Sequence, residues 1–227
     1  MLEELRQYYR SVGISAEGFA CPNYPACSNG KPKFTTAKEP FVSSGYVNHT
    51  LPRVLFISLD SGSAETDPAL KTLEAVRQHE EFTEDVLGLP KNKHWYRTHE
   101  LAHAVLSKFF PALHLEQARH HFAHMNSAKC CENNPGRAQA DGTLFNNCRG
   151  FIPREIEILA PDVLISQGAW GKAAVNGAFP ELEKPAYFPA ALDELKLIQV
   201  NDRAVIWLHT YHPRNGSFHT RNRANLP

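Results

Sequence analysis

The chain has 227 residues, of which 42% are hydrophobic and 21% are charged, and its 24 basic side chains balance its 24 acidic ones. This composition is sufficient for one large folded domain over residues 1–227 and excludes a disordered or fibrous protein. Because the net charge is zero, no global electrostatic field attracts nucleic acid, and binding to it would require a local basic patch.

No apolar run approaches the roughly 20 residues of a membrane span, and the charged start of the chain, Met1–Tyr9, does not resemble a secretory signal. We therefore expect a cytoplasmic, monomeric protein with no membrane partner. In that setting five cysteines and twelve histidines favour a metal or cluster site over a disulfide framework.

The first part of the chain predicts one helix, a long loop and a buried strand. Leu2–Val12 has apolar residues at helical spacing and precedes Gly13, which predicts a short docking helix. Residues 14–50 hold an early cysteine pair and clusters of proline and glycine, which predict loop with short strands. Val54–Leu59 is a continuous apolar, β-branched run, typical of a strand buried on both faces of a parallel sheet.

Helices and strands alternate in the rest of the chain. Asp67 followed by Pro68 is a helix cap followed by a first-turn proline. The alternation predicts an α/β fold, a three-layer α/β/α sandwich around a mostly parallel sheet of four to five strands. We expect helices over residues 67–80, 98–110 and 148–159, strands over residues 122–126, 162–166, 195–200 and 204–208, and a polar, basic tail over residues 209–223.

Polar side chains follow three of the predicted strands. Asp60 comes directly after the first strand, Asn126 ends the second, and His212 follows the last. Ligands bind outside the carboxyl ends of parallel strands, so these side chains predict a functional rim. Taken singly, each also fits a structural role, as a turn or cap residue for Asp60 and Asn126 and as a packing residue for His212.

The cysteines form a second group. Cys21 and Cys27 lie near the N-terminus, and Cys130 and Cys148 follow after about a hundred residues, with Cys131 in excess and able to replace Cys130. Zinc sites favour two closely spaced pairs, whereas iron–sulfur clusters tolerate wider spacing, so we favour an iron–sulfur cluster with zinc as the alternative. The cysteines could also be independent buried residues.

Several motifs together resemble the uracil-DNA glycosylase superfamily, and most closely its iron–sulfur branch, often called family 4. Asn126–Cys130 is similar to the branch's Asn-x-x-Lys-Cys segment, and Asn134–Arg137 to the loop that follows it. Pro161–Gly168 is similar to the next helix-to-strand step, and Tyr211–Pro213 to the His-Pro-Ser motif. Ser58–Gly62 stands at the first active-site motif. The resemblance covers most of the chain and implies the fold of that superfamily.

The resemblance also implies a DNA glycosylase that flips a pyrimidine nucleotide and hydrolyses its N-glycosidic bond. Asn126 would read the edge of the base, His212 would stabilise the negative charge on the leaving base, and Asp60 would orient water and offset the positive charge on the sugar. Trp95 or Tyr96 would stack on the base, although a packing role is as well supported for Trp95.

In the same resemblance, the segment after His212 leads into a loop that enters the duplex. Arg214, Arg221 and Arg223 would contact phosphate, and Phe218 would act as a wedge, unless the tail is simply an exposed polar terminus. The four ligands of a 4Fe-4S cluster would be Cys21, Cys27, Cys130 and Cys148.

Four features depart from the family pattern, and the three of them that lie near the site suggest a changed substrate. Ser58–Gly62 replaces the usual Gly-Glu-Ala-Pro-Gly, Arg214 replaces the serine of His-Pro-Ser, the early cysteine pair is wider, and residues 64–92 form an insertion. The substrate is then uracil or a related deaminated base in repair, or a bulky hydroxymethylated or glucosylated cytosine of phage DNA in antiviral defence. No lysine stands directly at the strand ends, so we expect no lyase step. The third hypothesis is a non-catalytic, metal-stapled module that binds nucleic acid.

Overall fold

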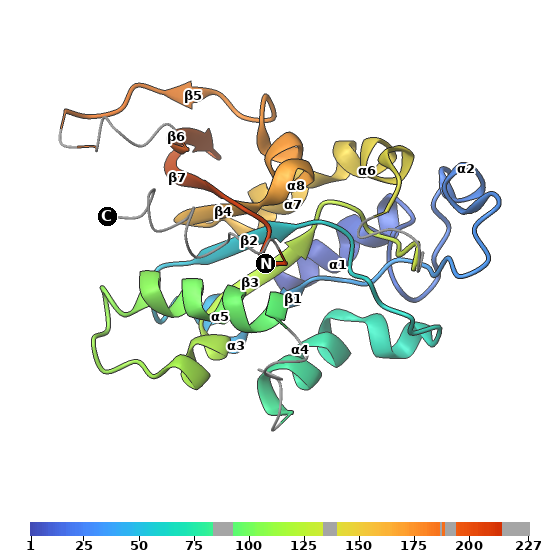
Figure 1. Cartoon of the computed structure of the whole chain (residues 1–227), viewed down its shortest axis with the longest axis horizontal. Helices are drawn as coiled ribbons and strands as arrows, with labels where there is room; N and C mark the ends of the chain where they lie inside the picture. The colour runs from blue at the N-terminus through green and yellow to red at the C-terminus, as the bar shows by residue number, and fades with distance from the viewer. Residues whose placement is uncertain (84–92, 134–139, 187, 189–193, 215–227) are drawn as a thin grey trace.

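The computed structural model describes residues 1–83, 93–133, 140–186, 188 and 194–214 (Figure 1). The α-helices are α1 (Leu2–Ser11), α2 (Tyr24–Ser28), α3 (Ser44–Asn48), α4 (Leu73–Phe82), α5 (Lys93–Leu106), α6 (Gly142–Cys148), α7 (Ile152–Leu159) and α8 (Gly168–Val175). The 3₁₀ helices are η1 (Pro68–Lys71), η2 (Leu115–His120) and η3 (Arg149–Phe151). The strands are β1 (Phe41–Val42), β2 (Val54–Ser58), β3 (Phe122–Asn126), β4 (Val163–Gln167), β5 (Glu181–Leu182), β6 (Leu195–Val200) and β7 (Arg203–Thr210).

The strands form one mixed sheet in the order β1-β3-β2-β4-β7-β6-β5. Its centre, β3-β2-β4-β7, is parallel, whereas β1, β6 and β5 pair antiparallel at the two sides. The α/β class is therefore confirmed, but the predicted count of four to five strands was too low. The edge strands β1 and β5 have only two residues each, which is too short for a hydrophobic period to be recognised.

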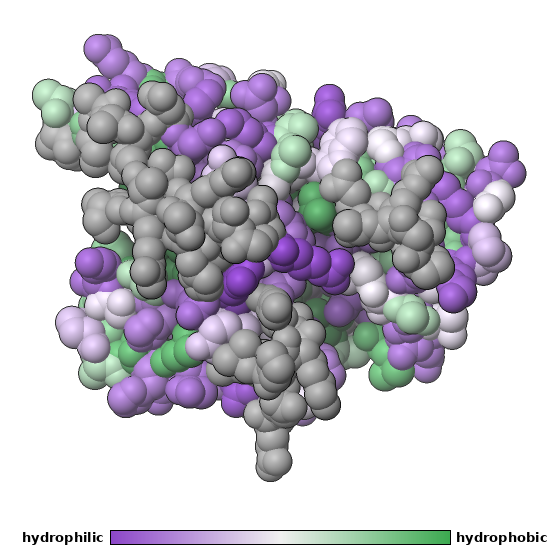
Figure 2. Space-filling view, viewed as in Figure 1, coloured by the Kyte–Doolittle hydropathy of each residue, from purple (hydrophilic) through white to green (hydrophobic). Residues whose placement is uncertain are grey.

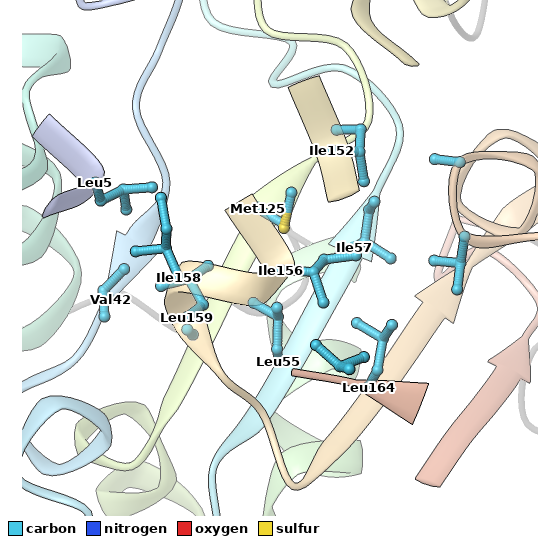
Figure 3. Packing of buried hydrophobic residues seen from close by; sticks show 14 of the residues in the cluster. Leu5, Val42, Leu55, Ile57, Met125, Ile152, Ile156, Ile158, Leu159 and Leu164 are labelled. Atoms are coloured by element: carbon cyan, nitrogen blue, oxygen red, sulfur yellow. The ribbon is translucent and has the colours of Figure 1, made fainter. Parts of the chain in front are cut away.

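Both faces of the central strands are buried, and their side chains alternate between two cores. Leu55 and Ile57 pack with α1, α7 and α8 on one face, and Figure 3 shows this cluster. Val54 and Phe56 pack with α5 and η2 on the other face. Figure 1 shows α4 and α5 on one side of the central strands and α6, α7 and α8 on the opposite side. The chain thus forms three layers, as expected for strands that alternate with helices.

The sheet face under α5 becomes polar toward the carboxyl ends of the strands. On this face each central strand carries apolar side chains near its amino end and buried polar side chains at its carboxyl end. These polar residues are Ser58 on β2, His124 and Asn126 on β3, Gln167 on β4 and Thr210 on β7. A buried polar group must be hydrogen-bonded or it costs stability, so this end of the sheet differs in kind from the rest of the core.

Two of the predicted helices have different bounds in the structure. The helix expected over residues 67–80 is interrupted at Thr72, an extended residue whose side chain accepts a hydrogen bond from the Ala75 N–H and so begins α4 separately. The helix expected over residues 98–110 is shifted to Lys93–Leu106. Phe109 and Phe110, counted in its apolar stripe, lie beyond its end and are exposed.

The helix expected over residues 148–159 is three elements, because Cys148 ends α6 and Pro153 stands in the first turn of a new helix, α7. Residues 14–50, expected to be loop with short strands, contain one short strand, β1, and the two helices α2 and α3. His209, expected in the tail, belongs to β7.

At the amino ends of the strands, Asp162 connects three elements. Its carboxylate accepts hydrogen bonds from the Arg53 N–H at 2.8 Å, from His49 Nε2 at 3.1 Å and from the Arg203 guanidinium. Burial alone would raise the pKa of this carboxyl, but these donors outweigh burial and lower it. Among the described residues, no helix combines the length and apolarity needed to cross a bilayer.

Candidate active site

The predicted rim residues follow strands on both sides of the point where the order of the parallel strands reverses. Chain order runs from β2 outward to β3 and then back across β2 to β4, so the switch point lies between β2 and β4. Asp60 follows β2, and Asn126 ends β3 directly beside Ser58. His212 follows β7, the neighbour of β4. The topology therefore brings the three predicted residues to one edge of the sheet.

Gly168 makes the close approach of these segments possible. Its φ is +82°, and a Cβ built at this position would lie 3.1 Å from His212 Cβ and 3.6 Å from both His212 Cδ2 and Leu59 Cδ2. Only a residue without a side chain fits there without displacing its neighbours. The segments after β2 and β7 therefore meet over the backbone that follows β4.

The loop after β7 presents His212 in a defined tautomer. The Arg214 N–H donates to His212 Nδ1 at 3.3 Å, which leaves the other ring nitrogen, Nε2, to carry the proton. Burial, and after it the charge of Arg214, lowers the pKa of His212 to about 4. The Arg97 guanidinium on α5 donates to the Pro213 carbonyl and holds the loop. At neutral pH the imidazole is thus a neutral donor with no partner for Nε2 among the described residues.

Asp60 lies in a partly buried position beside Arg214. Burial raises the pKa of the Asp60 carboxyl, while backbone hydrogen bonds at Asp60 and Ala140 and the charge of Arg214 act in the opposite direction. Arg214 also acts on His212 and on His94. In the view of Figure 1, β7 ends near the middle of the molecule, and Figure 2 shows strongly hydrophilic side chains at that place. A fixed cation thus stands within range of the candidate base and the candidate donor.

Asn126 is 9% exposed, and its amide makes no hydrogen bond to another described residue. The parallel pairing continues beyond it, since the Ser127 N–H donates to the Ser58 carbonyl at 2.9 Å. A buried amide on a strand end that no described residue pairs with is suited to a ligand with both donors and acceptors, such as the edge of a base.

A hydrogen-bonded group behind the rim was not predicted. Ser58 Oγ donates to Gln167 Oε1 at 2.5 Å and lies 3.0 Å from His124 Nε2 and 3.4 Å from His94 Nε2. Thr98 Oγ1 lies 3.3 Å from Gln167 Nε2. The high histidine content was the one available signal, because these residues come from four separate segments that only the fold brings together.

The two aromatic candidates for base stacking lie in different surroundings. Trp95 is 7% exposed and packs edge-on against Phe41 and His124 in the core under α5, which favours its packing role. Tyr96 is half-buried. Trp95 and Tyr96 belong to the first turn of α5, and in that turn it is His94 that reaches the rim, where its ring stacks on His212. Of the predicted DNA contacts, Arg214 lies at the rim, while Phe218, Arg221 and Arg223 lie outside the described residues, as do residues 84–92 of the insertion and the Asn134–Arg137 loop.

Four cysteines gather where α2 and α6 meet the segment after β3. Cys27, Cys130 and Cys148 share one buried cluster, and Cys21 is close enough to raise the pKa values of Cys130 and Cys148. Burial is the main cause, and it raises the pKa of the Cys148 thiol to about 11. Asn147 Nδ2 donates to the Cys27 sulfur at 3.2 Å, and the Lys129 N–H to the Cys148 sulfur at 3.4 Å. Hydrogen bonds of this kind stabilise metal-bound thiolates, so the set fits a cluster.

Cys131 is placed differently from these four. Its sulfur contacts the hydroxyl of Ser61, next to Asp60, and its backbone pairs with Thr35. This arrangement favours Cys130 over Cys131 as a ligand. In the ranges that the structure describes, no three His, Cys, Asp or Glu side chains lie close enough together to hold a single metal ion.

Comparison with known proteins adds no family to this geometry: no family model matches the chain, and a search of curated proteins finds no significant match.

Proposed function

We propose that this protein is a monofunctional DNA glycosylase that flips a pyrimidine nucleotide and hydrolyses its N-glycosidic bond. The observation that carries the proposal is that Asp60, Asn126 and a neutral, donating His212 all lie at the carboxyl edge of the central parallel strands. The order of the parallel strands and the helices on both faces support a sandwich of the uracil-DNA glycosylase type. The motifs around Asn126 and His212 support the same family.

In the proposed reaction, His212, Asp60 and Asn126 have different roles. The bond between C1′ and the base nitrogen breaks, and its electron pair leaves with the base. His212 Nε2–H donates to the base oxygen on which negative charge develops. The Asp60 carboxylate offsets the positive charge on the sugar, takes a proton from a bound water and directs that water to C1′. Asn126 pairs with the edge of the flipped base.

A panel of labelled oligonucleotides tests the proposal. Single- and double-stranded DNA with one uracil, hypoxanthine, 5-hydroxymethylcytosine or glucosylated hydroxymethylcytosine is incubated with protein and scored for alkali-labile sites. We expect abasic product from at least one pyrimidine and a loss of about 10²–10⁴ in rate for Asp60→Asn. Asp202→Asn, an exposed carboxylate in the β6–β7 turn, is the matched control and should retain activity. Tight DNA binding without an abasic site on any pyrimidine would support the non-catalytic module instead.

A bulky modified cytosine is the second candidate substrate, and Arg214 is the observation that favours it. Its guanidinium lies over Gly62, 3.9 Å from the position of a built Cβ, where the family has a small hydroxyl. The five N–H donors of a guanidinium suit the hydroxyls of an attached sugar. Arg214→Ser should then lower the rate on glucosylated cytosine more than the rate on uracil. Equal losses on both bases would favour uracil and a role in repair over a role in phage defence.

We further propose that Cys21, Cys27, Cys130 and Cys148 hold a 4Fe-4S cluster. When bound, the cluster would tie the N-terminal segment, residues 1–50, to the sheet without taking part in hydrolysis. Anaerobically purified protein should be brown and contain iron and sulfide. Cys148→Ser should lose the iron, whereas Cys131→Ser, also buried but placed against Ser61, should keep it. Colourless protein with one equivalent of zinc would overturn the cluster in favour of zinc.

A further inference from the structure

The first turn of α5 places His94 against His212. Their ring centroids are 5.0 Å apart with an interplanar angle of 25°, so the two imidazoles are stacked. This separation leaves no room for a third ring between them. A flipped base therefore has to approach His212 from its edge, where Nε2 lies, and not from the face that His94 covers.

On the side away from His212, His94 is hydrogen-bonded to the polar carboxyl end of the sheet. Its Nε2 lies 3.4 Å from Ser58 Oγ, which donates to Gln167 and also lies 3.0 Å from His124 Nε2. A hydroxyl donates one hydrogen bond and accepts two, so Ser58 can receive an N–H from each histidine while donating to the amide. The network thereby fixes the position of the His94 ring relative to β2 and β4.

From these contacts we infer that His94 is a positioning residue, whose anchored ring confines His212 against the backbone of Gly168 and directs its Nε2–H toward the substrate. This inference rests on the proposed function for the identity of the substrate. Gly168 limits His212 from the side of β4, since a built Cβ there lies 3.1 Å from His212 Cβ. Phenylalanine at position 94 would retain the stack but would leave one acceptor site of Ser58 empty.

The surroundings of His212 give this role a measurable signature. The groups that face it are His94 from α5, His124 from β3 and Arg214 from its own loop, and Arg97 on α5 binds the adjacent Pro213 carbonyl. All of them are cations or become cations on protonation. Of these groups, the charge of Arg214 opposes a charge on His212, and so does burial of the ring, to which the stacked His94 contributes; a charge on His212 in turn lowers the pKa values of His94 and His124.

The first experiment follows the His212 ring by NMR in protein labelled with ¹⁵N-histidine, with the signal assigned through His212→Gln. In the wild type His212 should titrate with a pKa of about 4. In His94→Ala the midpoint should rise by about one pH unit or more, because water reaches the exposed ring face. In His94→Phe it should stay close to the wild-type value, and the exposed His114→Ala is the matched control. An unchanged midpoint in a folded His94→Ala protein would overturn the inference.

The second experiment measures single-turnover cleavage on the best substrate of the oligonucleotide panel. We expect His94→Ala to lower the chemical rate by about tenfold or more with unchanged DNA affinity, and His94→Phe to fall between it and the wild type. Because the NMR titration needs no substrate, a shifted midpoint without cleavage of any oligonucleotide would refute the proposed function and leave the positioning role intact. If the wild-type protein cleaves a substrate and His94→Ala has the same rate and the same His212 midpoint, only the positioning role is refuted.

Discussion

Gly168→Ala tests whether the close approach of His212 to the sheet matters for function. The substitution adds a Cβ at φ +82°, 3.1 Å from His212 Cβ. A non-glycine residue in such a conformation costs about 1–3 kcal/mol, which should appear as a lower free energy of unfolding. The contact also requires His212 to move by a few tenths of an ångström, which we expect to lower the rate of base excision by about tenfold.

Gly177→Ala is the matched control for this substitution. Gly177 has a similar φ of +76°, but no atom lies within 4 Å of its built Cβ. Urea unfolding should therefore show a comparable loss of stability in both variants, while single-turnover assays should show a loss of rate in Gly168→Ala alone. Equal rates in the two variants, at equal loss of stability, would refute the argument that Gly168 positions His212.

Two further predictions concern charges at opposite ends of the strands. Arg214 lowers the pKa values of both Asp60 and His212, so Arg214→Gln should raise both and move the acid limb of the pH–rate profile to higher pH. The exposed Arg149→Gln should leave that limb in place, and an unchanged limb in Arg214→Gln would contradict the charge argument. Asp162 has a lowered native pKa, so its carboxylate contributes stability above its ordinary pKa of 3.8 and loses that contribution as the pH falls through the native value. Asp162→Asn should therefore cost about 1–2 kcal/mol in urea unfolding at pH 7 and progressively less as the pH falls below 3.8, and equal stability at pH 7 would contradict this.

The central strands were predictable because burial on both faces leaves a continuous apolar run in the sequence. Val54–Ser58 and Phe122–Asn126 are strands where the pattern placed them. Helix ends were less predictable, because they depend on contacts far away in the chain. Phe109 and Phe110 continue the apolar period of α5, yet the chain turns after Leu106 and leaves both exposed.

The candidate site was predictable where polar residues follow strands and not where they lie within or beneath them. Asp60 and His212 stand just after apolar runs, so the rule for parallel sheets identifies them. His124 lies inside β3 and His94 on a helix, and nothing local relates either residue to Ser58. Their association depends on the register of β2 with β3 and on the docking of α5, which are properties of the tertiary structure.

Polar groups are buried at both ends of the parallel strands, but the two ends differ in whether these groups have hydrogen-bond partners. At the amino ends, Asp162 has a donor on each carboxylate oxygen, as expected of a structural tie. At the carboxyl ends, burial holds His94 and His124 neutral, while the amide of Asn126 and Nε2 of His212 have no partner among the described residues. Apolar residues would complete that part of the core at lower cost, because buried polar groups contribute little unless every one is satisfied. Local departures of this kind are concentrated at functional sites, which favours the carboxyl edge over the amino edge as the place where substrate binds.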